Sequence, residues 1–305
     1  MGLQQNLNDI QTNLLQAKTA IAQSITAKGV ECSADDQLSS YASKIDSITT
    51  GSTGGTGEKF VVPNGLKFGY STVFDPSLYD VSNVTDMRSM FSNCSGLTGE
   101  LDLSSWNVSN VTTMEYMFNQ CSKLTSIDLS GWNTTNVRTI SNIFSNCNNL
   151  TTLDLSNFDT SNVISLGYAF NGCSGLINLD LSNFDTSKVT GLTYTFGGCS
   201  GLTTLNLSSF NLLNVLDMAR MFYNCKSLTN LQLNDLGHNQ KCTSLDLSPC
   251  SALTKDSILF LFNNAFDRAT AGYTTAFTIT LNATTKALLT EDEIAIATNK
   301  GFTVV

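Results

Sequence analysis

The sequence has little of what enzymes and nucleic-acid-binding proteins use. It contains one histidine, three prolines and two tryptophans in 305 residues, and only 13% of its residues are charged. Average proteins carry about 25% charged residues. The net charge of -9 disfavours a phosphate-backbone partner, which needs clustered Lys and Arg. We therefore expect no nucleic-acid partner.

Long apolar runs are also missing. The longest strongly apolar run covers residues 258–262, far too short to cross a bilayer, so we expect no membrane insertion. No N-terminal segment joins a basic region to an apolar run of roughly 7–15 residues, the pattern of a secretory signal. We expect the protein to stay in the cell that makes it, or to leave without a cleaved signal, as inside a virus particle.

Catalytic and metal-binding patterns are missing too. The single histidine, His238, lies in an irregular polar segment. No Ser/His/Asp set, nucleotide-binding glycine loop or zinc-ligand spacing accompanies it. We expect a surface histidine without a role, no catalytic residues, no cofactor and no metal site.

What the sequence does have is a repeat with a period of 26 residues, and 27 in the first period. Cysteines mark it at Cys94, Cys121, Cys147, Cys173, Cys199 and Cys225. A phenylalanine precedes each cysteine by three places, at Phe91, Phe118, Phe144, Phe170, Phe196 and Phe222. The extra residue of the first period lies near Gly99 and Glu100. A fixed period of this length indicates a solenoid, in which each unit packs on its neighbours.

Each repeat divides into two halves. In residues 150–175, Leu153 and Leu155 belong to a predicted strand, followed by a turn over residues 156–162. Val163, Leu166 and Phe170 then follow at spacings that suit one face of a short helix or 3₁₀ segment. The predicted fold class is an α/β solenoid, a leucine-rich repeat whose short parallel strands pair into one sheet, with an N-terminal helical segment and an α/β C-terminal cap.

The chain outside the repeats predicts three further parts. Residues 3–28 carry a heptad seam typical of a coiled coil, which favours self-association of N-terminal helices, although a hairpin with a second helix would also cover the seam. The C-terminal part predicts a helix over 254–268, a strand from residue 277, a helix capped by Thr290 and a final strand. The expected domains are 1–48 (helical attachment or oligomerisation), 49–57 (Gly/Ser/Thr linker), 58–253 (solenoid) and 254–305 (cap).

The repeat cysteines occupy equivalent positions, which indicates a stacked row of buried, reduced thiols. Cys242 and Cys250 lie outside the period, and a bridge between them stays open. Cys32 has no evident partner.

Four other rows recur with the period. Asp102, Asp128, Asp154 and Asp180 form a surface row that is either a solvated acidic stripe or a place where a cation relieves repulsion. Asn83, Asn110, Asn136, Asn162 and Asn214, interrupted by Lys188, are expected to bond turn backbone. Trp106, Trp132, Phe158, Phe184 and Phe210 favour core packing over sugar stacking. A variable row holds Ser89, Tyr116, Asn142, Tyr168, Tyr194 and Arg220.

The variable row is expected to face outward, and Tyr and Arg are favoured at contact surfaces. Ordinary solvent-facing variation explains it as well. The candidate ligand-binding residues are Tyr116, Tyr168, Tyr194 and Arg220 of this row together with the four aspartates.

The repeat resembles the BspA-like leucine-rich repeat, also found in mycoplasma surface lipoproteins. Residues 150–159 carry its strand half, Leu-Thr-Thr-Leu-Asp-Leu-Ser-Asn-Phe-Asp, and residues 110–121 carry the other half. The resemblance covers about residues 80–250 and implies a cell-surface adhesion or interaction protein. Residues 288–304 and 17–30 are similar to segments of gut phage repeat proteins and tail proteins.

Together these features favour a non-enzymatic phage tail-fibre or receptor-binding protein in the virion tail. Its expected partners are a host cell-surface protein or glycan, other virion tail proteins and copies of itself bound through the N-terminal helices. The alternative is a BspA-like adhesin on a bacterial cell surface.

Overall fold

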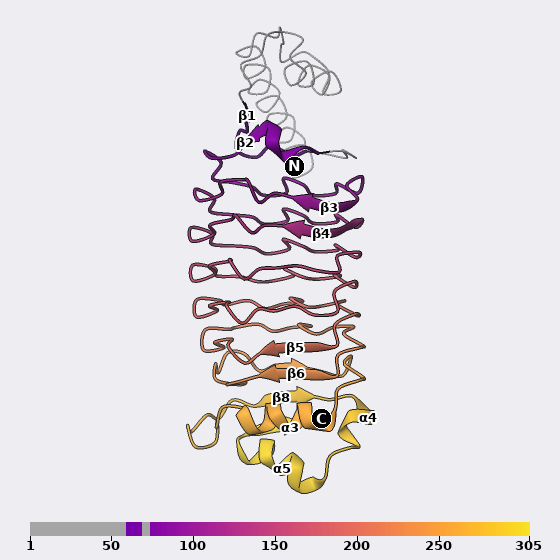
Figure 1. Cartoon of the computed structure of the whole chain (residues 1–305). Coiled ribbons are helices and arrows are strands. Elements are labelled where there is room, and N and C mark those ends of the chain that lie inside the picture. The colour runs from indigo at the N-terminus through magenta and orange to yellow at the C-terminus, as the bar shows by residue number, and fades with distance from the viewer. Residues whose placement is uncertain (1–58, 69–73) are drawn as a thin grey trace, which may run out of the picture.

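The structure is a stack of similar coils closed by a small α/β unit. A computed structural model describes residues 59–68 and 74–305, and Figure 1 shows their coils following one another along a single axis. The predicted N-terminal helical segment (1–48) and linker (49–57) lie outside the described residues, as does Cys32.

One side of the stack carries short parallel strands. The first pair is β1 with β2, and a 3₁₀ helix, η1, comes directly before β2. Two further pairs lie within the repeats, β3 with β4 and β5 with β6. Their bounds are Phe60–Val61 (β1), Pro76–Leu78 (η1), Tyr79–Asp80 (β2), Gly99–Asp102 (β3), Leu124–Asp128 (β4), Thr204–Leu207 (β5) and Asn230–Leu233 (β6). The register between β3 and β4 shifts between Gly99 and Glu100, where the sequence places the extra residue of the first period.

The prediction of one continuous sheet is wrong for the described coils. No strand forms over residues 150–155 or 176–181, although Leu153, Leu155 and Leu181 are buried in strand-like alternation. Single backbone bonds continue the contact, as from Thr151 N to Thr125 O at 3.0 Å. The leucines therefore follow the inward-facing period of a strand without completing its hydrogen-bond ladder.

The second half of each coil is a run of turns, and the predicted short helix is absent there. Alternate backbone N–H groups donate to the next coil: Leu166 N bonds Gly191 O at 3.1 Å, and Tyr168 N bonds Thr193 O at 2.9 Å. The N–H groups between them close turns within the coil, as from Ala169 N to Leu166 O at 3.0 Å. Parallel bridges from Asp86 through to Asp217 join every neighbouring pair of coils. This turn ladder is more regular than the strand pairs, and it fixes the spacing of the coils.

Aromatic and thiol rows fill the space between the two halves. The six repeat phenylalanines stack with ring centroids 5.5–6.0 Å apart and planes at most 16° from parallel. The repeat cysteines are buried, as predicted, and those from Cys121 to Cys225 carry free thiols. The Cys147 Sγ donates to Phe118 O at 3.1 Å, and the same contact recurs between later coils. Burial raises the pKa of Cys147 to about 12. Cys242 and Cys250 are also free, so no bridge joins them.

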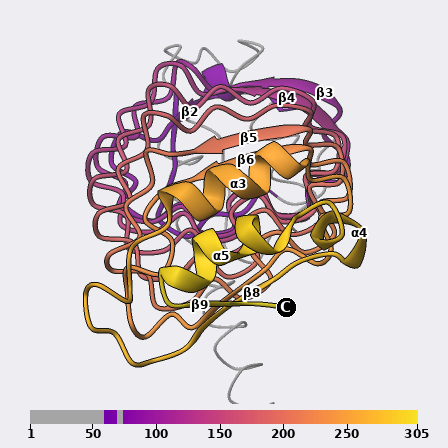
Figure 2. The same ribbon diagram turned by 90° about the horizontal axis from the view of Figure 1, so that it is seen from below.

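The C-terminal cap covers the last coil. Figure 2 shows α3 and α5 across that end of the stack. The cap consists of β7 (Ser244–Asp246), α3 (Lys255–Asn264), β8 (Phe277–Thr280), α4 (Ala283–Lys286), α5 (Glu291–Asn299) and β9 (Phe302–Val304), with strand order β7-β8-β9. The Ser257 hydroxyl accepts from Leu231 N and donates to Leu231 O, so α3 satisfies the edge of β6. Thr290 and Glu293 form a capping box at α5. The predicted helix, strand, helix and final strand are present in that order, and α4, which was not predicted, lies between β8 and α5.

A buried arginine holds the cap together, which the sequence does not indicate. Arg268 is fully buried, and its guanidinium donates to the carbonyls of Gly237 and Thr275. Its Cζ lies 5.3–5.9 Å from the ring centroids of Tyr273, Phe277 and Phe302. Desolvation lowers the pKa of Arg268.

Candidate functional site: a tyrosine row at left-handed backbone positions

Each coil holds two residues in the left-handed backbone region, and these residues form two rows. The first row is the variable row of the sequence: Ser89, Tyr116, Asn142, Tyr168, Tyr194 and Arg220, with φ between 51° and 59°. The second row lies four residues further on: Asn93, Gln120, Asn146, Gly172, Gly198 and Asn224, with φ between 60° and 75°. In this region Gly costs least and Asn is the most tolerated side chain, whereas bulky residues are disfavoured.

The two rows differ in how they meet this constraint. The second row uses Asn or Gly in every coil but one. The first row places three tyrosines and an arginine at the same kind of backbone position. Unfavourable backbone states persist where the surrounding structure enforces them, and they concentrate at functional sites. The tyrosine row is therefore the strongest candidate for a recognition surface.

Four side chains of this region gather into one cluster, which we name the tyrosine patch: Tyr168, Tyr194, Arg220 and Tyr223. The rings of Tyr168 and Tyr194 stack at 4.9 Å with 17° between their planes, and Tyr223 meets Tyr194 edge-on at 5.9 Å. The Arg220 guanidinium lies 5.6 Å from the Tyr194 centroid and 5.9 Å from that of Tyr223. Its Nη1 also donates to the Tyr194 hydroxyl, and this bond raises the pKa of Arg220.

No carboxylate of the described chain pairs with Arg220. Asp217, three residues earlier, instead accepts from Thr193 Oγ1 at 2.6 Å and from Ala219 N at 2.7 Å. The guanidinium is thus oriented by two aromatic rings while its charge stays without an acidic partner.

Tyr116 stands apart from the patch. Asn142 occupies the row position between Tyr116 and Tyr168, so the two tyrosines are two coils apart, about 10 Å at a coil spacing of ~4.8 Å. Tyr116 is 44% exposed. In this row Tyr116, Tyr168 and Arg220 are exposed, whereas Ser89, Asn142 and Tyr194 are half-buried. The structure brings together three of the four candidate binding residues of the row, Tyr168, Tyr194 and Arg220.

The four candidate aspartates form a separate row in the strand half of the coils. Each accepts from the backbone N–H two residues later at 2.9 Å, in Asp102, Asp128, Asp154 and Asp180 alike. Hydrogen bonds from the Ser104 hydroxyl and then its N–H lower the pKa of Asp102, and the N–H groups of Ser156 and Ser182 are the main cause of the lowered pKa of Asp154 and Asp180. No hydrogen bond or ion pair among the described residues links this row to the tyrosines, so the sequence-based candidate set divides into two groups. The aspartates hold turns, and residues 59–68 and 74–305 contain no group of three His, Cys, Asp or Glu able to hold a metal ion.

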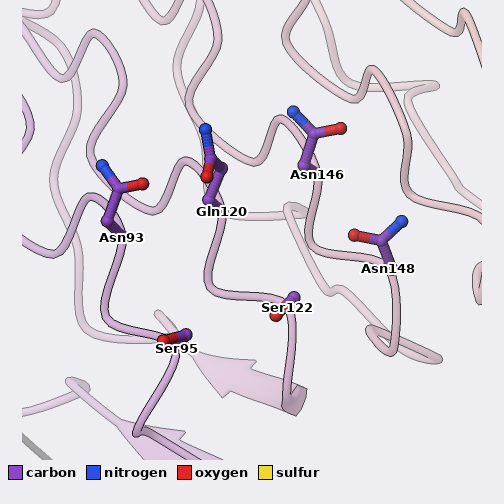
Figure 3. Close-up of a pocket in the computed structure, with 6 residues that line it drawn as sticks. All are labelled: Asn93, Ser95, Gln120, Ser122, Asn146 and Asn148. Atoms are coloured by element: carbon purple, nitrogen blue, oxygen red, sulfur yellow. The ribbon is translucent and has the colours of Figure 1, made fainter. Parts of the chain in front are cut away.

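A polar hollow is the feature that the sequence analysis missed. Figure 3 shows its lining, two side chains from each of three coils, and its volume is about 530 Å³. The lining residues are Asn93, Ser95, Gln120, Ser122, Asn146 and Asn148. The lining residues come directly before and directly after the buried cysteines Cys94, Cys121 and Cys147. Polar residues on both sides of each repeat cysteine are the sequence signal that would have located the hollow. In the next coil the equivalent position is Gly172, where an added Cβ would come within 2.7 Å of Asn146 Oδ1. This position therefore has no side chain in that coil.

Two other rows have structural roles, as predicted. Asn110, Asn136, Asn162 and Asn214 each donate from Nδ2 to a backbone carbonyl of the preceding coil at 2.6–2.9 Å. The aromatic row from Trp106 to Phe210 is buried, with no side chain above 3% exposed. His238, predicted to be a surface residue, is half-buried and stacks on Phe266 at 4.2 Å.

The geometry defines a protein of stacked coils with a row of tyrosines at left-handed backbone positions. The chain belongs to the family described as Mycoplasma protein of unknown function, DUF285, which matches residues 67–175 and 142–246. This family is associated with BspA-like repeat proteins. No curated protein and no solved structure matches the chain. Within the described residues, no helix has the length and apolar character to cross a membrane.

Proposed function

We propose that the protein is a non-enzymatic receptor-binding protein, a phage tail-fibre component that presents a leucine-rich repeat surface for host attachment. The observation that carries the proposal is the placement of Tyr116, Tyr168, Tyr194 and Arg220 at left-handed backbone positions, with Tyr194 half-buried and the other three exposed. Because Asn or Gly would fit that backbone more easily, the tyrosines are explained by what they contact outside the chain.

The proposed fold class is a leucine-rich repeat solenoid of BspA-like type with an α/β cap. Its support is the 26-residue period, the parallel bridges between successive coils and membership of the DUF285 family. The assignment to a phage tail is supported by the resemblance of the two termini to phage proteins.

The proposed mechanism is multivalent attachment. Single coils contact the host surface weakly, and copies tethered through residues 1–48 convert later contacts into intramolecular ones, which strengthens binding without new chemistry. The partners are then a host cell-surface protein or glycan and other tail proteins, and the location is the virion. The second candidate is a bacterial cell-surface adhesin, as the resemblance of the repeat to the BspA-like family implies.

The test compares binding of the labelled full-length chain to host cells with binding of two variants. Tyr194→Asn changes the tyrosine patch to a residue that the same row already accepts at Asn142. Asp154→Asn changes the aspartate row to a residue that accepts the same turn bond in Asn206. We expect at least a fivefold loss of cell binding with Tyr194→Asn and none with Asp154→Asn. Equal binding by all three proteins would refute the tyrosine row as the attachment surface.

The location has its own measurement. Mass spectrometry of purified virions and of the bacterial surface fraction separates the two candidates. We expect the chain in virions; its presence only in the surface fraction would replace the tail-fibre proposal with the adhesin.

A further inference from the structure

The tyrosine patch combines an oriented cation with aromatic surface, and this combination specifies a class of ligand. We propose that the patch binds a sugar carrying a single carboxylate, of the uronic-acid type, with the carboxylate on Arg220 and the pyranose ring against the tyrosines. The inference rests on the proposed function, because it names the ligand chemistry of the same attachment surface.

Arg220 is arranged to receive an anion. A guanidinium has five N–H donors in a planar fork that matches a carboxylate, and one of its nitrogens is engaged by the Tyr194 hydroxyl. Contacts with the rings of Tyr194 and Tyr223 hold the planar group in place. An arginine already oriented loses less side-chain freedom when it binds, which favours a ligand that meets the free N–H groups.

The surroundings favour one negative charge over many. The chain carries 25 acidic and 16 basic side chains, and Asp217 lies on the same coil as Arg220. The patch contains no second Lys or Arg. A polyanion or a strongly acidic peptide would bring further charges against an acidic surface with nothing to neutralise them, whereas a single carboxylate uses the one cation available.

The aromatic groups favour a sugar ring as the scaffold of that carboxylate. The face of an aromatic ring carries partial negative charge, and the axial C–H groups of a pyranose carry partial positive charge, so the two pack face to face. Tyr223 is 50% exposed beside Arg220, and Tyr168, 36% exposed, stacks on the Tyr194 ring one coil further along. Their hydroxyls are also free to bond the hydroxyls of a sugar, since no bond from either is found within the described chain.

A matched pair of ligands tests the inference on the full-length chain. Methyl β-D-glucuronide and methyl β-D-glucoside differ only at C6, where the first has a carboxylate. We expect NMR titration at low salt to show at least about fivefold tighter binding of the glucuronide, with the largest shifts in tyrosine ring signals and a preference that falls as salt rises.

Variants locate the effect. Arg220→Gln should reduce the preference for the glucuronide to about onefold, and the left-handed backbone accepts glutamine, as Gln120 shows. Arg138→Gln is the matched control, because Arg138 is exposed in another row and should leave the preference unchanged. Tyr168→Asn should weaken both sugars together.

The remaining outcomes distinguish this inference from the function on which it rests. Equal affinity for the two sugars, or an equally strong response to the peptide Gly-Gly-Glu, would overturn the sugar-acid assignment. Absence of sugar binding together with loss of cell attachment in Tyr194→Asn would overturn it while leaving the attachment function in place. Selective glucuronide binding by a chain that attaches to no host cell would support the ligand class and refute the function.

Discussion

The strain in the tyrosine row can be measured at Tyr116, whose ring contacts no other aromatic ring within residues 59–68 and 74–305. Tyr116 has φ 57° and an exposed side chain, whereas Tyr223 is similarly exposed and is not among the residues with positive φ. Replacing each tyrosine by Asn and by Ala gives four single variants. Both variants at one site lack the tyrosine ring. The difference in stability between the Asn and Ala variants therefore excludes most of the effect of losing that ring.

The expected magnitude follows from the backbone. The left-handed region costs an ordinary L-residue roughly 1–2 kcal/mol, and Asn enters it more easily because its short polar side chain bonds nearby backbone. At position 116, the Asn variant should therefore be more stable than the Ala variant by about 0.5–1 kcal/mol. At position 223 the same comparison should give about zero, within ~0.3 kcal/mol, because ordinary backbone offers Asn no such advantage.

Urea unfolding of the full-length chain followed by circular dichroism measures these differences. A calorimetric scan should show the advantage of Tyr116→Asn over Tyr116→Ala as a rise of roughly 1–4 °C in melting temperature. If Asn and Ala are equally stable at position 116, or if Asn gains as much at position 223, then the row carries no backbone strain and the tyrosines no longer indicate recognition.

Three further predictions concern the core, the cap and the turns. Arg268→Met leaves the carbonyls of Gly237 and Thr275 without their donor and should lower the free energy of unfolding in urea by about 2–5 kcal/mol. The stability of Arg268→Lys should lie between those of the Met variant and the parent. A Met variant as stable as the parent would contradict this role of the arginine in the cap. The eight described cysteines are buried, so a thiol reagent at pH 8 should label none of them before urea unfolds the chain, while a Ser105→Cys control reacts at once. Fast labelling of any parent thiol other than that of Cys32 would place a described cysteine at the surface. The hydrogen bond from the Ser156 N–H lowers the pKa of Asp154 in the folded chain, so the stabilisation by this carboxylate is complete above the pKa of the unfolded chain, about 4, and is lost as pH falls through the lowered pKa. The Asp154→Asn variant should therefore lose less stability than the parent as pH falls through this range, and an acid unfolding profile equal to that of the parent would contradict this role.

The rows that face inward could be predicted from the sequence because burial leaves a direct signature. A cysteine, a phenylalanine and a leucine recurring with one period occupy equivalent places in the coil, and the structure buries them. The asparagine row was also predictable, since a turn backbone needs donors and an amide in every coil can supply them. These inferences require only that equivalent residues meet equivalent neighbours.

The turn half of the coil was mispredicted for a definite reason. Buried residues at Val163, Leu166 and Phe170 have the spacing of a helix face, and successive i to i+3 turns produce the same spacing. A run of turns differs from a helix in having residues with positive φ. Asn146 and Gly172 indicate such positions in the sequence, but Tyr168 and Tyr194 do not, because tyrosine rarely adopts the left-handed conformation. The prediction of a continuous sheet was wrong for a similar reason. Leu153 and Leu155 alternate with exposed residues as in a strand, whether or not the backbone forms the hydrogen-bond ladder of a sheet.

The same geometry explains why the variable row can change without disturbing the fold. The backbone N–H at this row donates to the next coil whatever side chain is present: Tyr116 to Ser141 O at 3.0 Å, Asn142 to Gly167 O at 3.0 Å, and Tyr194 to Ala219 O at 2.9 Å. The side chain itself contributes nothing to that bond, and it points away from the phenylalanine stack. Because each coil contacts only its neighbours, a change at one row position alters one place on the outer surface and leaves the ladder intact. Substitution at these positions is therefore limited mainly by the backbone cost of the left-handed region.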